Sequence, residues 1–151
     1  MTGPEAKTPR SVLFLCNLNA VRSPMAKALA DHHCRRRVFV DSAGIRAGEL
    51  DGFAVAAMDE LGLDILGHEP KQIGDVVPQD FDLIVTLSPE AHHQALEFTL
   101  DSDLAVEYWP TPDPTATEGS REVILDAYRA VRDRLRTRIA ERFDFAAPGH
   151  L

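Results

Sequence analysis

The sequence has few cysteines, no long apolar run and fewer basic than acidic residues, and each shortage excludes a class of protein. Only two of its 151 residues are cysteine, Cys16 and Cys34. No histidine lies at ligand spacing from them, so no zinc site is predicted, and in a reducing compartment neither is expected to form a structural disulfide. No segment is long and apolar enough to span a bilayer, and the polar N-terminus lacks the apolar centre of a signal peptide. We therefore expect a cytoplasmic protein without a membrane partner.

The shortage of basic residues limits the partners further. Lysine and arginine number 16 against 24 aspartates and glutamates, which gives a formal net charge of −8. A chain with this acidic excess is not expected to bind nucleic acid. Any anion site in it has to be built by groups close to the anion.

The length is sufficient for one domain with its own core. Polar residues and prolines at the start, and Pro148 and Gly149 near the end, indicate frayed termini. We expect an N-terminal tail over residues 1–10, a single domain over 11–145 and a C-terminal tail over 146–151.

Short apolar runs alternate with segments of helical periodicity along this domain. Strands are expected over 12–15, 38–40, 82–86 and 105–109, and helices over 24–34, 53–61, 89–98 and 121–143. Ser42-Ala43-Gly44 is expected to break the second strand. The alternation predicts an α/β fold, a single four-stranded parallel sheet with helices on both faces. Ligands bind such sheets beyond the carboxyl ends of the strands, which is where the first and fourth strands end.

The segment between the first strand and the first helix has a Cys-x5-Arg-Ser pattern. Ser23 is expected to be the N-cap of the helix and Pro24 to lie in its first turn. Unpaired amides and the dipole at a helix N-terminus attract an anion, and the Arg22 guanidinium can bind two phosphate oxygens at once. The same positive field favours the Cys16 thiolate, which can attack phosphorus. The pattern predicts a loop that holds phosphate, sulfate or a similar oxyanion, formed after Cys16 by Asn17, Leu18, Asn19, Ala20, Val21 and Arg22.

Each of these residues also has a less specific interpretation. A lone cysteine at the end of a strand is more often a buried structural residue, and a lone arginine is usually on the surface. Their joint spacing, with a buried strand before and a helix after, favours the phosphate loop.

A second candidate is Asp113, in the segment Trp109-Pro110-Thr111-Pro112-Asp113-Pro114-Thr115. Three prolines stiffen this segment, and its place after the fourth strand puts it at the same sheet edge as Cys16. A carboxylic acid there could protonate the leaving group of a phosphate ester. Asp-Pro is also a common turn dipeptide, and the residues alone leave both interpretations open.

The loop resembles the active-site loop of the low-molecular-weight protein tyrosine phosphatases. The family pattern Cys-x-x-Asn-x-x-Arg-Ser is matched by Cys16, Asn19, Arg22 and Ser23, and the likeness continues in Ser42-Ala43-Gly44 and in Asp113-Pro114, from Ser11 to about Phe143. The resemblance implies the fold of that family and a cysteine-dependent phosphomonoester hydrolase that needs no metal or cofactor. Its expected substrate is a phosphorylated protein or a small phosphoester.

The resemblance also implies roles for individual residues. Cys16 is expected to be the nucleophile, Arg22 to bind phosphate and Asp113 to be the general acid. Asn19 is expected to hold a strained loop with the help of Ser42, and Ser23 to hydrogen-bond the thiolate.

The chain departs from the family at several positions. Val21 stands where many members have a second cysteine, and Leu18 replaces a common glycine. Thr115 and Ala116 follow the Asp-Pro in place of aromatic residues, which leaves the preference for phosphotyrosine open. His68 lies in a stretch that resembles the family's loop-supporting histidine region, and we assign no site role to it or to Cys34.

Two other functions are considered. The same scaffold hosts arsenate reductases, but these relay oxidation to further cysteines, and Cys34 is expected at the far end of the first helix. A non-catalytic phosphate- or phosphopeptide-binding module is the other alternative, although nucleophile and acid candidates are both present.

Overall fold

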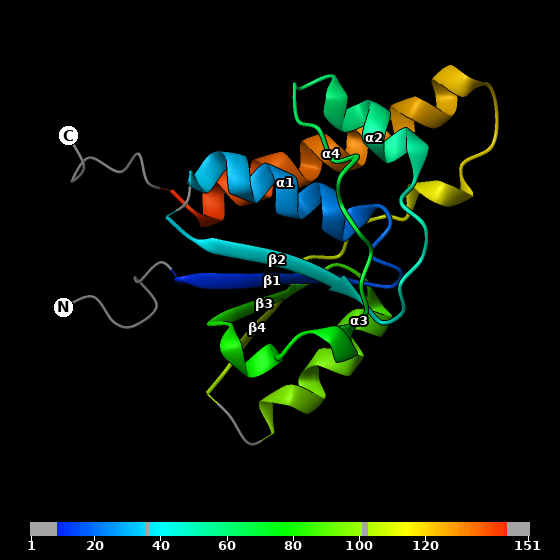
Figure 1. Cartoon of the computed structure of the whole chain (residues 1–151). Coiled ribbons are helices and arrows are strands. Elements are labelled where there is room, and N and C mark those ends of the chain that lie inside the picture. Colours follow the sequence, from blue (N-terminus) through cyan, green and yellow to red (C-terminus); the bar gives the residue numbers. More distant parts are fainter. Residues whose placement is uncertain (1–8, 36, 101–102, 145–151) are drawn as a thin grey trace, which may run out of the picture.

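The computed structural model describes residues 9–35, 37–100 and 103–144 (Figure 1). Most of the two expected tails, residues 1–8 and 146–151, lies outside the described residues. The strands are β1 (Ser11–Cys16), β2 (Phe39–Gly44), β3 (Leu83–Thr86) and β4 (Ala105–Tyr108). The main helices are α1 (Arg22–Cys34), α2 (Gly52–Asp59), α3 (Pro89–Leu96) and α4 (Arg121–Arg142).

The four strands form one sheet in the order β2-β1-β3-β4, and every neighbouring pair is parallel. β1 is an inner strand, paired on both sides, and Val12 to Leu15 are fully buried. This explains why β1 is continuously apolar rather than alternating. The predicted fold class is confirmed, and each predicted strand is found within a few residues of its expected bounds.

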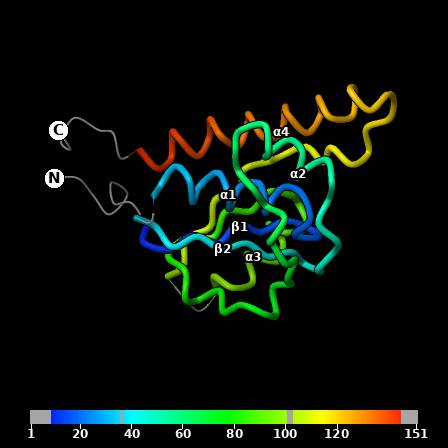
Figure 2. Tube along the Cα trace, turned by 45° about the horizontal axis from the view of Figure 1, so that its top comes forward, coloured from blue at the N-terminus to red at the C-terminus, as the bar shows by residue number. Residues whose placement is uncertain are grey.

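Helices cover both faces of the sheet (Figures 1 and 2). Val12 and Phe14 of β1 belong to the larger apolar cluster, with residues of α1, α2 and α4, whereas Leu13 and Leu15 belong to a second cluster with residues of α3. Successive side chains of a strand point to opposite faces, so this single strand supplies both cores. α4 contributes Tyr128, Val131, Leu135 and Ile139 to the larger cluster.

Two sequence-based expectations about the first half of the chain are wrong. Ser42-Ala43-Gly44 does not break the second strand, because β2 continues to Gly44, which pairs with Cys16. Ser23 is not the N-cap of α1, because the helix begins at Arg22 and Val21 is its cap residue, without a side-chain cap bond. Ser42 and Ser23 are both fully buried. The Ser42 hydroxyl accepts from the Asn19 side chain and the Ser23 hydroxyl contacts the Cys16 thiol, so neither binds the amide of a turn or a helix.

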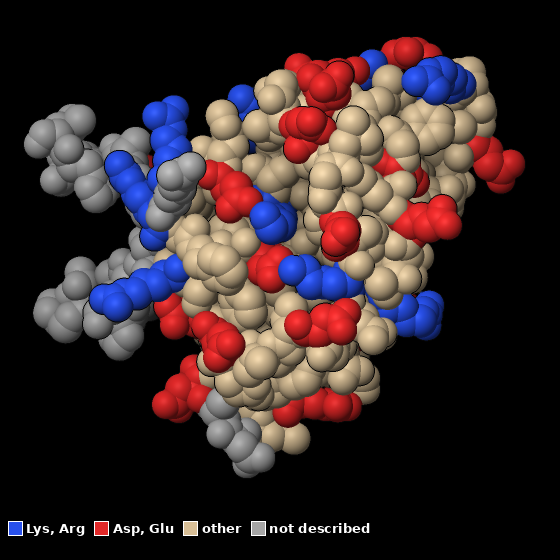
Figure 3. All heavy atoms as spheres, in the orientation of Figure 1, with Lys and Arg blue, Asp and Glu red and all other residues tan. Residues whose placement is uncertain are grey.

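Charged side chains of one sign do not form a single large patch on the face shown in Figure 3. Acidic residues are scattered over most of it, and several basic ones gather at its left edge, beside the end of α1. No helix in the described part of the chain is long and apolar enough to cross a membrane. An anion site in this acidic protein therefore depends on local geometry.

Candidate active site

The loop after Cys16 is held by its carbonyl groups. The segment 45–51, which follows β2, donates four backbone hydrogen bonds of 2.8–3.1 Å to the carbonyls of Cys16, Asn17, Leu18 and Ala20. Within the described chain, the amides of residues 17–22 donate to no protein acceptor. These amides lead into the uncapped N-terminus of α1, and together they make a cradle that can bind an oxyanion.

The close packing of this loop on β2 requires a glycine at position 44. A Cβ there would lie 2.6 Å from the Asn19 nitrogen and 2.7 Å from the Leu18 carbonyl carbon. Only a residue without a side chain lets the two backbones approach this closely. The glycine of the Ser-Ala-Gly segment is thus explained by the position of the loop.

The Cys16 thiol lies at the base of the cradle, next to Ser23. Its Sγ atom is 2.9 Å from Ser23 Oγ, and both residues are buried. A hydroxyl at this distance can donate to a thiolate and stabilise it. Ser23 lies in the first turn of α1, so the same sulfur also faces the positive end of the helix.

Asn19 is the most highly connected residue of the loop. Its backbone has a positive φ of 54°, a left-handed conformation that asparagine tolerates better than most residues. The side-chain Nδ2 donates to Ser23 Oγ at 2.8 Å and to Ser42 Oγ at 2.9 Å. Its Oδ1 accepts from the Lys71 amide at 2.9 Å and from His68 Nε2 at 3.0 Å. The fully buried amide therefore uses all its hydrogen-bonding groups to hold the loop.

Arg22 connects the loop with the segment that carries Asp113. Its Nη1 donates to the carbonyl of Thr111 at 3.0 Å, and its Nη2 lies 3.9 Å from Asp113 Oδ2. Arg22 and Thr111 are each only 7% exposed, whereas the Asp113 side chain is 49% exposed. The topology thus brings together two residues 91 positions apart, as predicted from the shared sheet edge.

The two oxygens of Asp113 have different partners. Oδ1 accepts from the amide of Thr115 at 3.0 Å and from its hydroxyl at 2.7 Å, so the Asp-Pro turn is also present. Oδ2 faces Arg22. Burial acts to raise the pKa of Asp113, but the two bonds from Thr115 and the charge of Arg22 outweigh it and hold the pKa below its usual value. A phosphoryl dianion bound to Arg22 would oppose this effect and favour the protonated acid.

The remaining loop residues occupy different positions. Asn17 accepts from Ser88 Oγ at 2.6 Å, which links the loop to the N-terminus of α3. Ala20 and Val21 are buried, and Leu18 is 42% exposed and lies beside Gly48.

Sequence reasoning missed three contributors to the site. His68 was given no role, yet it supports Asn19, and burial lowers its pKa, which favours the neutral ring that donates from Nε2. The Lys71 amide and the Thr111 carbonyl are backbone groups, and no side-chain pattern indicates them.

Cys34 is buried at the last residue of α1, and burial together with Asp31 raises its pKa to about 11.

The fold and this loop define a class of protein, the single-domain α/β proteins with a Cys-x5-Arg oxyanion loop between the first strand and the first helix. The chain belongs to the low molecular weight phosphotyrosine protein phosphatase family, whose model matches residues 11–144.

Known relatives and structures support this membership. An arsenate reductase of Bacillus licheniformis is 34% identical over 134 residues, which cover 86% of this chain and 92% of the relative. An arsenate reductase in the phosphate-binding state has a TM-score of 0.69 at 26% identity, covering 87% of this chain and 95% of that one. The YwlE arginine phosphatase, as a cysteine-to-serine mutant with a phosphorylated active-site serine, has a TM-score of 0.71 at 25% identity, covering 85% and 90%.

Proposed function

We propose that this protein is a phosphomonoester hydrolase that acts on phosphotyrosine in proteins through a phosphocysteine intermediate on Cys16. The observation that carries the proposal is the convergence of three groups: the Cys16 sulfur 2.9 Å from the Ser23 hydroxyl, the free loop amides, and Arg22 3.9 Å from Asp113. A nucleophile, an oxyanion cradle and an acid at one sheet edge are the parts that phosphoryl transfer to cysteine needs.

In the first step the Cys16 thiolate attacks phosphorus and the S–P bond forms. The bond between phosphorus and the ester oxygen breaks, its electron pair goes to that oxygen, and Asp113 supplies the proton. Arg22 and the amides of residues 17–22 stabilise the equatorial oxygens of the transition state. Ser23 stabilises the thiolate before attack.

In the second step Asp113, now ionised, takes a proton from water as the water oxygen attacks phosphorus. The S–P bond breaks, and its electrons return to sulfur as the thiolate. Phosphate leaves, and Asp113 is again protonated for the next cycle.

The proposal is tested by measuring phosphate release from a phosphotyrosine peptide, a phosphoarginine peptide and phenyl phosphate. Wild-type protein should hydrolyse the phosphotyrosine peptide, Cys16→Ser should not, and Asp113→Asn should be roughly 10²–10⁴-fold slower on aryl substrates. If the protein hydrolyses only the phosphoarginine peptide, the cysteine-dependent mechanism would stand but the preference for phosphotyrosine would be refuted. Turnover by Cys16→Ser at the wild-type rate would refute the mechanism.

Arsenate reduction is a second candidate, favoured by the 34% identity to an arsenate reductase. It needs two electrons from thiols after Cys16 has bound arsenate. Cys34 is poorly placed to supply them, because the 13 residues of α1 span about 20 Å and a disulfide needs Cα atoms within about 7 Å. The protein would then depend on an external dithiol, so arsenite production with thioredoxin and its reductase, at a rate that exceeds phosphate release, would favour this candidate.

A further inference from the structure

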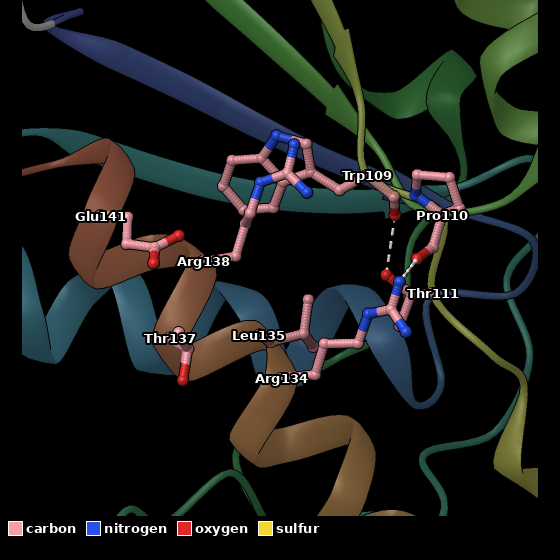
Figure 4. A pocket seen from close by; sticks show the side chains of 8 residues that line it. All are labelled: Trp109, Pro110, Thr111, Arg134, Leu135, Thr137, Arg138 and Glu141. Carbon is pink, nitrogen blue, oxygen red and sulfur yellow. Dashed lines mark hydrogen bonds between the residues drawn. The ribbon is translucent and has the colours of Figure 1, made fainter.

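α4 carries three arginines four residues apart, Arg134, Arg138 and Arg142. This spacing places them on one face of the helix. Arg142 contacts β4 itself, and Arg138 and Arg134 contact the two residues that follow β4. Arg142 Nε donates to Glu107 Oε2 at 2.8 Å. Figure 4 shows the other two: the Arg138 guanidinium lies 5.0 Å from the centre of the Trp109 ring, and Arg134 Nη2 donates to the Pro110 carbonyl at 3.0 Å. In an acidic protein, this row of cations on one segment requires an explanation.

The contacted segment leads directly to the candidate acid. We call residues 109–115 the Asp113 loop. Trp109, which opens it, is only 2% exposed, meets Phe14 of β1 edge-on at 5.9 Å and donates from Nε1 to Glu107. Trp109 therefore contacts both the Arg138 guanidinium and the strand that ends at Cys16.

A groove of about 320 Å³ lies between residues 109–111 of this loop and α4. Its walls include Trp109, Pro110 and Leu135, and in Figure 4 the Arg134 and Arg138 side chains extend across it from the helix to the loop. The loop is thus linked to the helix here by two guanidinium groups, and not only by close-packed apolar side chains. On its other side, Arg22 binds the carbonyl of Thr111, the residue next to Pro110.

Consecutive carbonyls of the loop are therefore held by two arginines from two helices. Arg134 holds Pro110 from α4, and Arg22 holds Thr111 from α1. Arg22 is also the group proposed to bind phosphate. A second anchor keeps the loop in place when Arg22 turns its donors to a substrate.

We infer that Arg134 and Arg138 are positioning residues for general-acid catalysis. They hold Pro110 and Trp109 so that Asp113 Oδ2 stays where the ester oxygen leaves. This inference rests on the proposed function, since it assigns the arginines a role in delivering the proton from Asp113. It predicts that variants without Arg134 and Arg138 hydrolyse a substrate more slowly the more its leaving group needs that proton.

The test compares kcat/KM for phenyl phosphate, whose leaving group needs a proton, and p-nitrophenyl phosphate, whose leaving group needs it less. The Arg134→Ala/Arg138→Ala double variant should lose roughly tenfold on phenyl phosphate, a fraction of the 10²–10⁴ that an acid supplies, and less than about twofold on p-nitrophenyl phosphate. In an Asp113→Asn background the same two substitutions should not further change the ratio of kcat/KM for phenyl phosphate to kcat/KM for p-nitrophenyl phosphate.

Arg136→Ala is the matched control, because Arg136 lies on the same helix but lines a groove toward α1. It should leave the ratio unchanged. Circular dichroism reports whether each variant folds. The single Arg134→Lys variant, which keeps a charged donor, should lie between wild type and Arg134→Ala.

Equal losses on both substrates, or a change of ratio that persists in the Asp113→Asn background, would overturn the inference. Failure of the wild type to hydrolyse either substrate would instead refute the proposed function. An active wild type with unchanged ratios in the double variant refutes only the role of the arginines.

Discussion

Replacement of Asn19 by alanine should destabilise the protein more than any other single change in the loop. The side chain makes four hydrogen bonds, to Ser23, Ser42, the Lys71 amide and His68. Each bond is worth about 0.5–1.5 kcal/mol net, and alanine in the left-handed conformation costs a further 1–2 kcal/mol or so. The expected loss is about 3–8 kcal/mol, a large fraction of the roughly 5–15 kcal/mol that stabilises a typical domain.

The assay is urea unfolding at pH 7, followed by far-UV circular dichroism and by the emission of Trp109, the only tryptophan. At about 2–4 °C per kcal/mol, the melting temperature should also fall by about 6–32 °C. Asn19→Gly separates the two causes, because glycine accepts the positive φ but keeps none of the side-chain bonds. If either variant unfolds within about 1 kcal/mol of wild type, the hydrogen-bond network does not stabilise the loop as argued.

Three further predictions concern pH and redox chemistry. Thr115→Val removes a donor to Asp113, so the pKa of Asp113 should rise and the alkaline limb of kcat/KM should move to higher pH; an unmoved limb would contradict this. Burial lowers the pKa of His68, so its contribution to stability is complete above about pH 6.5 and is lost as the pH falls. The wild type should therefore lose more stability than His68→Gln between pH 7 and pH 5 in urea unfolding, and equal losses would exclude His68 as the cause. Cys34→Ala should leave the rate and reversibility of inactivation by peroxide unchanged. If the oxidised variant instead regained activity more slowly than oxidised wild type when a monothiol is added, this would show that Cys34 resolves oxidised Cys16.

The sheet could be predicted from the sequence because its two inner strands, β1 and β3, are short and buried on both faces. Val12 to Leu15 and Leu83 to Val85 are apolar without interruption, and prolines, glycines and polar residues separate them from the helices. The order β2-β1-β3-β4 did not have to be known to place the Cys16 and Asp113 loops at one edge, since all strands are parallel. The error at Ser42 shows the limit, because a buried polar residue satisfied by a distant amide cannot be distinguished from a turn residue.

The side chains of the site were predictable where the chemistry itself selects the residue type. Cysteine and arginine at these positions follow from what a phosphate ester needs, whereas the residues alone left Asp113 open between an acid and a turn, and the resemblance favoured the acid. Supporting groups were predictable only by resemblance, as for Asn19 and Ser42, or not at all, as for the Lys71 amide and the Thr111 carbonyl. Any residue type can supply a backbone amide or carbonyl, so such contacts leave no trace in a sequence.

The choice between phosphate and arsenate chemistry does not depend on the loop. Both oxyanions have the same shape and charge, and the amides and Arg22 would bind either of them. The reactions diverge after the covalent step, since hydrolysis needs an acid and a water whereas reduction needs a second thiol. In this chain the carboxylate of Asp113 lies 3.9 Å from Arg22, while the remaining cysteine is buried at the end of a 13-residue helix with a pKa of about 11. The positions of these two groups, Asp113 and Cys34, are therefore the reason for proposing hydrolysis in preference to reduction.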